Sequence, residues 1–192
     1  SALCELNYTP EQADGSVKID KAINIAEQYE VSKQFWSYLV EKGIIKNPSH
    51  FIRQVPHMSA VFGEKDVRFL KTRFETLTQQ NLFKGMEYTE DKQQLQDWVP
   101  LMMDGRDSNE QVAATKMDIG TDVNFGALTR DLVSYLDGKD NIKLSLNQEV
   151  KDIDREDDGR WEVEVKDLAT GEKREILAKF VFIGAGGHSL LL

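Results

Sequence analysis

The sequence predicts a mixed α/β fold, and this prediction rests on three observations. Apolar residues recur at every third or fourth position in three long segments, which is the spacing of amphipathic helices. After Gly138 the spacing changes to two, which is typical of strands with one buried face. Residues 180–183 form an apolar run with no polar interruption, as expected of a strand that is buried on both faces.

Four helices are expected from this spacing and from the residues at their ends. Asp20 stands at the N-cap position of the first helix, and Gly43 marks its end. The second helix follows Gly63, a shorter one ends before Pro100, and the last is closed by Gly138. The apolar positions that define these helices are Ala22, Ile25, Ala26, Tyr29, Trp36, Leu39 and Val40, then Val67, Leu70, Phe74 and Leu77, then Leu95 and Trp98, and finally Leu128, Leu132 and Leu136.

The other segments before residue 127 lack a helical period. Residues 1–19 contain proline, aspartate and glycine without any period, so they predict a loop. Residues 51–62 are apolar but are broken by Pro56, which predicts a strand with an irregularity. Residues 101–126 hold several turn residues and predict irregular structure.

The last third of the chain predicts strands joined by tight turns. Apolar and polar residues alternate over residues 142–147 and again over residues 161–166. The Asp-Gly pair at residues 158–159 predicts a hairpin turn between these two strands. The Thr-Gly pair at residues 170–171 predicts a second turn, which leads into a strand that ends near Lys179.

Composition excludes several classes of protein. The 192 residues are 40% hydrophobic and 30% charged, which is typical of a globular domain with a sizeable core. No apolar run approaches the roughly 20 residues that a membrane-spanning helix needs. The formal net charge of −9 disfavours nucleic acid as a partner. The single cysteine, Cys4, excludes an internal disulfide framework and a cysteine-based zinc site, and the three histidines lack the spacing of metal ligands.

The two ends of the chain suggest that it is part of a longer protein. The sequence begins at Ser1 without a methionine, a basic segment or an apolar leader. It ends five residues after a glycine turn that should open a helix. We therefore expect an excised piece of a larger chain.

Two segments are candidates for chemistry that involves a histidine or an arginine. His57 follows Pro56, so an irregular strand could direct its imidazole into a cleft, although a lone histidine is also common as a structural residue. Arg106 lies in a Gly-Arg-Asp turn, where its guanidinium could bind a carboxylate. The alternative is an ordinary surface turn with an internal pair between Arg106 and Asp107.

Two further segments have a functional and a structural interpretation. The Gly-Ala-Gly-Gly sequence at residues 184–187 could bring main-chain N–H groups close to a dinucleotide, or it could simply be a tight turn between a strand and a helix. Residues 149–158 contain six carboxylates. A solvated hairpin end explains them better than a pair of catalytic acids, because catalytic acids need burial to separate their pKa values.

Five segments, taken together, resemble the bacterial malate:quinone oxidoreductases. They are SALCELNYTP at residues 1–10, VPHMS at residues 55–59, GRD at residues 105–107, IGTDVNFG at residues 119–126 and KFVFIGAGG at residues 179–187. These segments span the whole chain in the order found in the family. The resemblance implies a membrane-associated flavoprotein that oxidises malate to oxaloacetate and passes the electrons to quinone. It also implies a fold in which a doubly wound FAD-binding domain is paired with a substrate domain built on a β-sheet with packed helices.

The resemblance implies a division of the chain and a set of contacts with the cofactor. Residues 1–46 and 121–192 would belong to the FAD domain, and residues 47–120 to the substrate domain. The main FAD fingerprint of the family precedes Ser1, so we expect FAD in the full-length protein and not in this piece alone. The residues implied to contact FAD are Ser1, Ala2, Val150, Gly184, Ala185 and Gly186.

The chemistry of malate oxidation then gives the two candidate residues a role. The hydroxyl proton needs a base, for which His57 is the candidate, and a malate carboxylate needs an arginine, for which Arg106 is the candidate. The implied partners are malate and a membrane quinone. The resemblance places the full-length protein on the cytoplasmic side of the bacterial inner membrane as a peripheral protein. Without the missing neighbouring strands the apolar run at residues 180–183 would lose the cover that buries it, so the isolated piece should self-associate or keep an exposed apolar patch.

Two alternatives stay open. A related flavin-dependent 2-hydroxy acid oxidase or dehydrogenase, such as a 2-hydroxyglutarate enzyme, resembles this sequence at residues 7–10 and at the final glycine turn. The longer matches around His57 and Arg106 favour malate. A non-catalytic binding module could also keep this fold without the cofactor.

Overall fold

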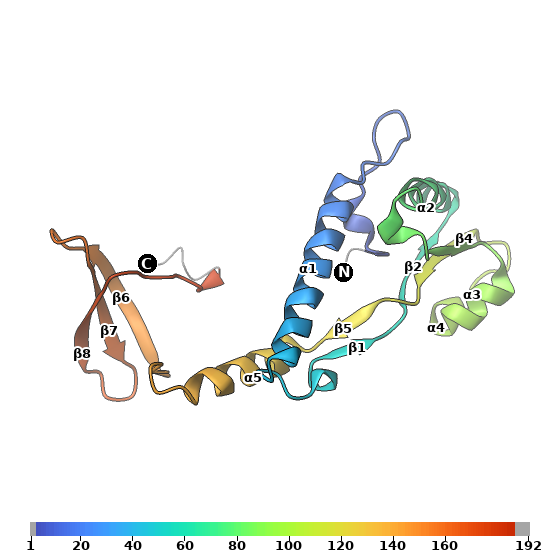
Figure 1. Cartoon of the computed structure of the whole chain (residues 1–192). Coiled ribbons are helices and arrows are strands. Elements are labelled where there is room, and N and C mark those ends of the chain that lie inside the picture. Colours follow the sequence, from blue (N-terminus) through green and yellow to red (C-terminus); the bar gives the residue numbers. More distant parts are fainter. Residues whose placement is uncertain (1–2, 187–192) are drawn as a thin grey trace. The chain divides into compact units, whose positions relative to one another are not determined.

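The computed structural model describes residues 3–186 and confirms the mixed α/β class (Figure 1). Ser1, Ala2 and the last six residues lie outside the described part. The FAD contacts predicted for Ser1 and Ala2 therefore fall outside the residues that the structure describes. The elements in chain order are η1 (Leu6–Tyr8), α1 (Asp20–Glu41), η2 (Pro48–His50), β1 (Ile52–Gln54), β2 (His57–Phe62), α2 (Glu64–Leu77), η3 (Asn81–Phe83), β3 (Glu87–Thr89), α3 (Lys92–Trp98), α4 (Pro100–Met103), β4 (Val112–Met117), β5 (Thr121–Val123), α5 (Phe125–Asp137), β6 (Gln148–Arg155), β7 (Trp161–Asp167) and β8 (Lys173–Ala178).

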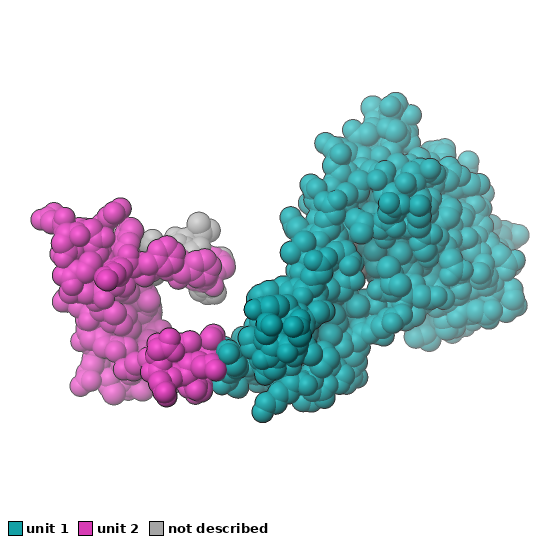
Figure 2. Space-filling view, viewed as in Figure 1, with its two compact units in different colours: residues 1–135 teal, residues 136–192 magenta. Residues whose placement is uncertain are grey.

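The chain forms two compact units, Ser1–Tyr135 and Leu136–Leu192 (Figure 2). The first contains a three-stranded sheet in the order β2-β4-β3 and a two-stranded sheet of β1 and β5. The second contains a three-stranded sheet in the order β6-β7-β8. Every strand pair within the described residues is antiparallel. Along the described part of the chain, no helix is long and apolar enough to cross a bilayer.

The β2-β4-β3 sheet is covered by helices on both faces. On one face Val61 and Ala113 pack with residues of α2. On the other face Phe62 and Ala114 pack with residues of α3 and α4. This arrangement follows from the alternation of side chains along a strand, which sends neighbouring residues to opposite faces. The sheet is therefore the buried centre of the first unit.

The prediction of irregular structure at residues 101–126 is wrong over β4 and β5, and also over the helical residues of α4 and the start of α5. Strand β4 is the central strand of its sheet, and five of its six residues are buried. A strand covered on both faces does not alternate in polarity, and the small residues Ala113 and Ala114 give no clear strand preference. The position of β4 is set by the strands on either side of it and not by its own sequence pattern.

Helix α1 runs from Asp20 to Glu41, and the predicted glycine lies two residues after its end. Asp20 is the first helical residue and not the N-cap, which is Ile19, so its carboxylate acts on the positive end of the helix dipole instead of capping it. At the other end Gly43 adopts a φ of +67° and donates its N–H to the carbonyl of Val40. The N–H of Ile44 reaches the carbonyl of Leu39, which completes a Schellman motif.

The irregularity predicted at Pro56 separates two strands that belong to different sheets. Strand β1 pairs with β5, whereas β2 pairs with β4, so the same two chain segments meet twice. Gly120 lies at the crossing, where its carbonyl accepts a hydrogen bond from the N–H of Val55 at 2.9 Å. A Cβ atom at Gly120 would lie 2.4 Å from the Val55 carbonyl oxygen and 2.7 Å from the His57 nitrogen. Only glycine fits at this point without a shift of the main chain.

The predicted turns of the second unit are confirmed, but its first strand lies later than expected. The hairpin turn at residues 158–159 places Arg155 opposite Trp161, so residues 148–155 pair with β7. Residues 142–147 alternate in polarity but have no partner strand, and they form no strand. The turn therefore decides which segment pairs, because it sets the register of the hairpin.

Residues 180–183 do not form a strand, and the run is exposed. Phe180 is 77% exposed and Phe182 is 83% exposed. A strand buried on both faces needs neighbouring strands and covering helices, and none covers this run within the described part of the chain. The exposed apolar surface expected for the isolated piece is thus confirmed at these residues.

Replacing Gly120 with alanine should destabilise the first unit. Because the added methyl group would collide with main-chain atoms and not with a flexible side chain, we expect Gly120→Ala to lower the free energy of unfolding by about 1–3 kcal/mol. Gly85→Ala is the matched control, since its nearest contact would be the Met117 Cε atom at 3.8 Å, and its effect should stay below about 0.5 kcal/mol. Urea unfolding of both variants measures the difference, and equal effects would contradict the crossing argument.

Candidate functional site

His57 begins strand β2 and is held by the N-terminal segment. Its Nδ1 atom accepts a hydrogen bond from the Cys4 N–H at 3.4 Å, and its carbonyl accepts one from the Cys4 thiol at 3.1 Å. The Ser59 hydroxyl, two residues along the same strand, donates to the Cys4 carbonyl. Cys4 is thus bound to β2 through its N–H, its carbonyl and its side chain.

These contacts define the protonation of the His57 ring. A neutral imidazole carries one N–H, and the nitrogen that accepts a hydrogen bond is the one without it. Because Nδ1 accepts from Cys4, the proton of neutral His57 lies on Nε2. Burial lowers the pKa of His57 below its usual value, the nearby Glu5 carboxylate acts in the opposite direction, and the Arg73 guanidinium lowers it further. The neutral ring is therefore the favoured form near neutral pH.

Arg73 is a functional candidate that sequence reasoning missed. It lies on α2 with no exposed surface, and its Nε atom donates to the Thr9 hydroxyl at 2.8 Å. Its Nη2 atom donates to the carbonyls of Leu3 at 3.1 Å and Glu5 at 3.0 Å. Burial lowers the pKa of Arg73, and Nη1 has no hydrogen-bond partner among the described residues. One guanidinium thus holds three points of the N-terminal segment.

A sequence signal for Arg73 exists in the spacing of α2. Arg73 stands three residues after Leu70 and four before Leu77, so it occupies the apolar stripe of its helix. A charged residue at such a position is either buried with partners or breaks the stripe. Cys4 is buried beside it, and burial raises the pKa of its thiol. Nothing in the sequence around Cys4 indicates its contact with His57, which lies 53 residues away.

Arg106 lies on the surface turn after α4, and its Nε and Nη1 atoms both have partners. Its Nε atom donates to the Met102 carbonyl at 2.6 Å, and its Nη1 atom forms an ion pair with Glu110 at 2.9 Å. The guanidinium carbon lies 3.4 Å from the centroid of the Phe62 ring. The internal pair between Arg106 and Asp107 that the alternative interpretation expects is not formed among the described residues: Arg106 pairs with Glu110, and Asp107 accepts the N–H of Asn109.

The structure does not bring His57 and Arg106 together. Arg106 stacks on Phe62, which ends β2, and His57 begins the same strand. At about 3.3 Å per residue the two strand ends are about 16 Å apart. The odd separation of five positions also sends the two side chains to opposite faces of the sheet. One malate molecule, with a backbone of four carbon atoms, cannot contact both residues in this arrangement.

The residues predicted to contact FAD in the second unit lie on an apolar strand face and in an exposed turn. Val150 lies on β6 opposite Val165, on the apolar face of its sheet, where a flat ring could pack. Gly184 and Ala185 are exposed, and Gly186 adopts a φ of +55°, so a ligand could approach the main chain there. In the part of the chain that the structure describes, no glycine-rich turn leads from a strand into a helix N-terminus, which is the usual cradle for a pyrophosphate. The described residues fit one portion of FAD and not the whole cofactor.

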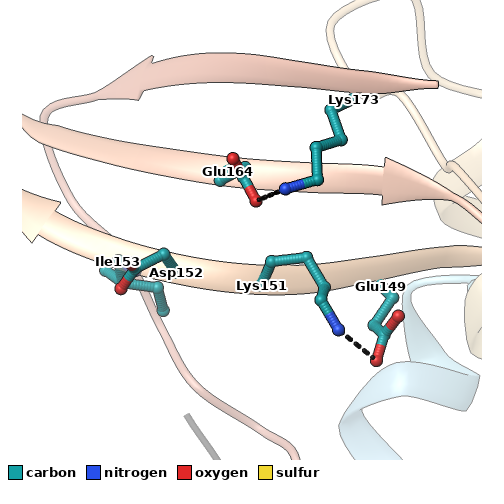
Figure 3. Close-up of polar contacts among 6 residues, drawn as sticks. All are labelled: Glu149, Lys151, Asp152, Ile153, Glu164 and Lys173. Carbon is teal, nitrogen blue, oxygen red and sulfur yellow. Dashed lines mark hydrogen bonds and ion pairs between the residues drawn. The ribbon is translucent and has the colours of Figure 1, made fainter.

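The acidic stretch at residues 149–158 lies on the solvent face of the second sheet, as expected. Glu149 pairs with Lys151 at 3.1 Å, and Glu164 pairs with Lys173 at 2.8 Å (Figure 3). Asp152 lies directly opposite Glu164 across the two strands, and it is exposed. Exposed carboxylates paired with surface lysines lack the burial that a catalytic acid pair needs.

Comparison with known proteins identifies a family that covers the entire chain. The model of the family described as "Malate:quinone oxidoreductase (Mqo)" matches residues 1–192. A probable malate:quinone oxidoreductase of Geobacillus sp. is 58% identical over 192 residues, and one of Flavobacterium johnsoniae is 53% identical over 192 residues. A probable malate:quinone oxidoreductase 1 of Pseudomonas aeruginosa is 54% identical over 193 residues.

These matches cover all of this chain but only part of each relative. The matched region is 38% of the Geobacillus protein, 39% of the Flavobacterium protein and 37% of the Pseudomonas protein. The chain therefore spans less than two fifths of the length of the curated relatives it matches.

Replacing the buried Arg73 with lysine should weaken the attachment of the N-terminal segment. Lysine keeps the charge but lacks the fork that reaches three acceptors, so at least two charged hydrogen bonds are lost at about 1.5–3 kcal/mol each. We expect Arg73→Lys to lower the free energy of unfolding by at least about 3 kcal/mol. Arg68→Lys, at an exposed position on the same helix, should change it by less than about 0.5 kcal/mol. Urea unfolding compares the two variants. If Arg73→Lys lowered the free energy of unfolding by less than about 1 kcal/mol, the attachment of the N-terminal segment would not depend on the guanidinium.

Proposed function

This chain belongs to the malate:quinone oxidoreductase family, and we propose that it forms part of an enzyme that oxidises (S)-malate to oxaloacetate and delivers the electrons to a membrane quinone. The family match over all 192 residues carries this proposal. The names of the relatives specify malate and quinone, and these relatives share 51–58% of their residues with this chain in the matched region.

The proposed reaction removes a hydride from C2 of malate and a proton from its hydroxyl group, and the quinone leaves as quinol. FAD, when bound, supplies the hydride acceptor. The protein must then hold two carboxylates, orient the C2–H bond and accept the hydroxyl proton. His57 and Arg106 are the residues of this chain that we propose as candidates for contact with malate. Because they lie near opposite ends of β2, only one of the two could contact a given malate molecule.

The domain assignment follows from the same proposal. Residues 47–120 contain the β2-β4-β3 sheet with its covering helices, and both candidate malate residues, so we assign them to the substrate domain. Residues 1–46 and 121–192 are assigned to the FAD side, with Val150 beneath part of the cofactor and Gly184–Gly186 of the chain's last described turn at its edge. Ser1 and Ala2 are proposed as further contacts. The pyrophosphate cradle would come from the part of the relatives' length that this chain does not span.

Quinones dissolve in the bilayer, so the full-length enzyme must meet the membrane surface to reduce them. We place it on the cytoplasmic face of the bacterial inner membrane as a peripheral protein. Peripheral binding needs either an apolar helix face or a basic patch. The net charge of −9 makes this chain a poor match for an anionic membrane surface, so we assign the attachment surface to other parts of the protein.

The decisive experiment uses the full-length protein that contains this chain. The purified protein should show the absorbance of bound flavin, and it should reduce a water-soluble quinone analogue when (S)-malate is added. 2-Hydroxyglutarate should be oxidised at least tenfold more slowly at equal concentration. Faster oxidation of 2-hydroxyglutarate would favour the related 2-hydroxy acid enzymes, and a protein without flavin or turnover would favour a binding module.

Arg106 as a ligand of malate stays a prediction, and Arg106→Lys tests it. A ligand role predicts that the KM for malate rises at least several-fold, since lysine keeps the charge but loses the planar fork. A role confined to the turn predicts an unchanged KM and a lower Tm, because the contacts with Met102 and Phe62 are lost. Steady-state kinetics and thermal melting of one preparation decide between the two roles.

The 192-residue chain by itself should not bind FAD tightly. Its described residues offer an apolar strand face and a few main-chain groups but no cradle for the pyrophosphate, and its net charge repels the phosphate groups. Calorimetric titration of the purified chain with FAD should therefore show no stoichiometric binding at micromolar concentration. Tight one-to-one binding would mean that most of the cofactor site lies within these residues.

A further inference from the structure

We infer that His57 binds a malate oxygen as a hydrogen-bond donor through its Nε2–H group and does not act as the general base. This inference rests on the proposed function, because malate oxidation supplies the ligand. It departs from the role that malate chemistry first suggested for His57. The contacts of His57 with Cys4 carry it.

The Cys4 N–H fixes the tautomer of His57. This group is a donor and cannot accept a hydrogen bond, so only the lone pair of Nδ1 can face it at 3.4 Å. A general base must offer a lone pair on Nε2, which in a neutral ring requires the proton to be on Nδ1. That tautomer would point two N–H groups at each other in a partly buried place. The observed contact therefore leaves Nε2 as a donor.

The Cys4 N–H cannot easily turn away, because the segment that carries it is tied on both sides. Arg73 donates to the carbonyl of Leu3 and to that of Glu5, the residues that flank Cys4. Ser59 donates to the Cys4 carbonyl, and the Cys4 thiol donates to the His57 carbonyl. The main chain at residue 4 is thus held by two charged and two neutral hydrogen bonds besides the one to Nδ1. Arg73 acts as a positioning residue for the imidazole.

The partial burial of His57 favours the same neutral form. Glu5 and Cys4 face it from the N-terminal segment, and Arg73 faces it from α2. Burial and the positive charge of Arg73 lower the pKa of His57, whereas Glu5 raises it. Protonation would also place a second N–H against Cys4. A neutral donor at Nε2 suits a substrate that offers oxygen acceptors, and malate offers two carboxylates and a hydroxyl oxygen.

The donor role is a binding contact and moves no proton. The hydroxyl proton of malate must then pass to a base other than His57. A hydrogen bond from Nε2–H to the hydroxyl oxygen would orient the C2–O bond and would stabilise negative charge as the O–H bond lengthens. His57 would thus act as the neutral histidine electrophile does in other enzymes that polarise a carbon–oxygen bond.

The tautomer can be read directly, without turnover. In the full-length protein labelled with ¹⁵N-histidine, long-range ¹⁵N–¹H spectra distinguish a protonated ring nitrogen from an unprotonated one. The resonances lost in His57→Gln identify the ring of His57. We expect the proton on Nε2 at neutral pH in the wild type and in Cys4→Ser, which keeps the main-chain N–H. A proton on Nδ1 would overturn the inference.

A matched pair of substitutions then separates donor from base in the active enzyme. His57→Gln carries an amide nitrogen to the position of Nε2 and keeps a donor there, whereas His57→Asn keeps an acceptor near Nδ1 but loses the donor. We expect kcat/KM for malate to fall less than about tenfold in His57→Gln and about 10- to 100-fold further in His57→Asn. A general base predicts a loss of about 10²- to 10⁴-fold in both variants, which would overturn the inference. His50→Gln, at an exposed histidine, is the control.

The two experiments, the spectrum and the kinetics, also separate this inference from the proposed function. If the wild type carries flavin but does not oxidise malate, the proposed function fails and the substrate role of His57 fails with it, whereas the spectrum still reports the tautomer. If malate is oxidised and the two variants lose activity equally, the proposed function stands and only the donor role is overturned.

Discussion

The first unit depends on a single buried guanidinium. Arg73 reaches from the apolar stripe of α2 to three acceptors in the N-terminal segment, and no carboxylate within the described residues forms an ion pair with it. A charge with no exposed surface is costly unless its donors are satisfied, so the segment has to stay bound for the charge to be tolerated. The core that includes Leu3, Cys4 and Met117 is closed by the same attachment. Folding of the sheet and placement of His57 are therefore parts of one packing event.

A second constraint places His57 with respect to the sheet. Two chain segments pair first as β1 and β5 and then as β2 and β4. The change of sheet occurs at Pro56, which has no N–H to donate to a strand ladder, and at Gly120, which leaves room for the opposite chain. His57 is the first residue after this crossing. Its ring faces the N-terminal segment because alternation along β2 sends Ser59 and Val61 to that same face. Phe62 lies on the other face, where its ring contacts the Arg106 guanidinium.

The second unit shows how one sheet can keep an apolar and an acidic face with an irregular sequence pattern. A bulge between Val150 and Asp152 turns Ile153 to the side of Val150, so both oppose valines of β7. The carboxylates then gather on the opposite face, where Glu175 and its acidic neighbours raise the pKa of Glu162. Carboxylates opposite one another across strands repel, so closer packing would not stabilise this face, and it is exposed to solvent. The apolar face and the exposed run after β8 are the surfaces that could accept a cofactor ring or further chain.

The sequence by itself determined the local features: the mixed α/β class, the presence of α1, α2, α3 and α5, the glycine that follows α1 and the two hairpin turns of the second unit. Each of these depends on residues a few positions apart, whose spacing is visible in one dimension. The family was also recognisable from short segments along the chain. Tertiary structure alone decided that β4 is a central strand, that residues 142–147 stay unpaired and that His57 and Arg106 lie at opposite ends of β2. It alone decided the partner of His57 as well, because the bond between Cys4 and His57 joins residues 53 positions apart, and such a contact exists only after α2 and the sheet have packed.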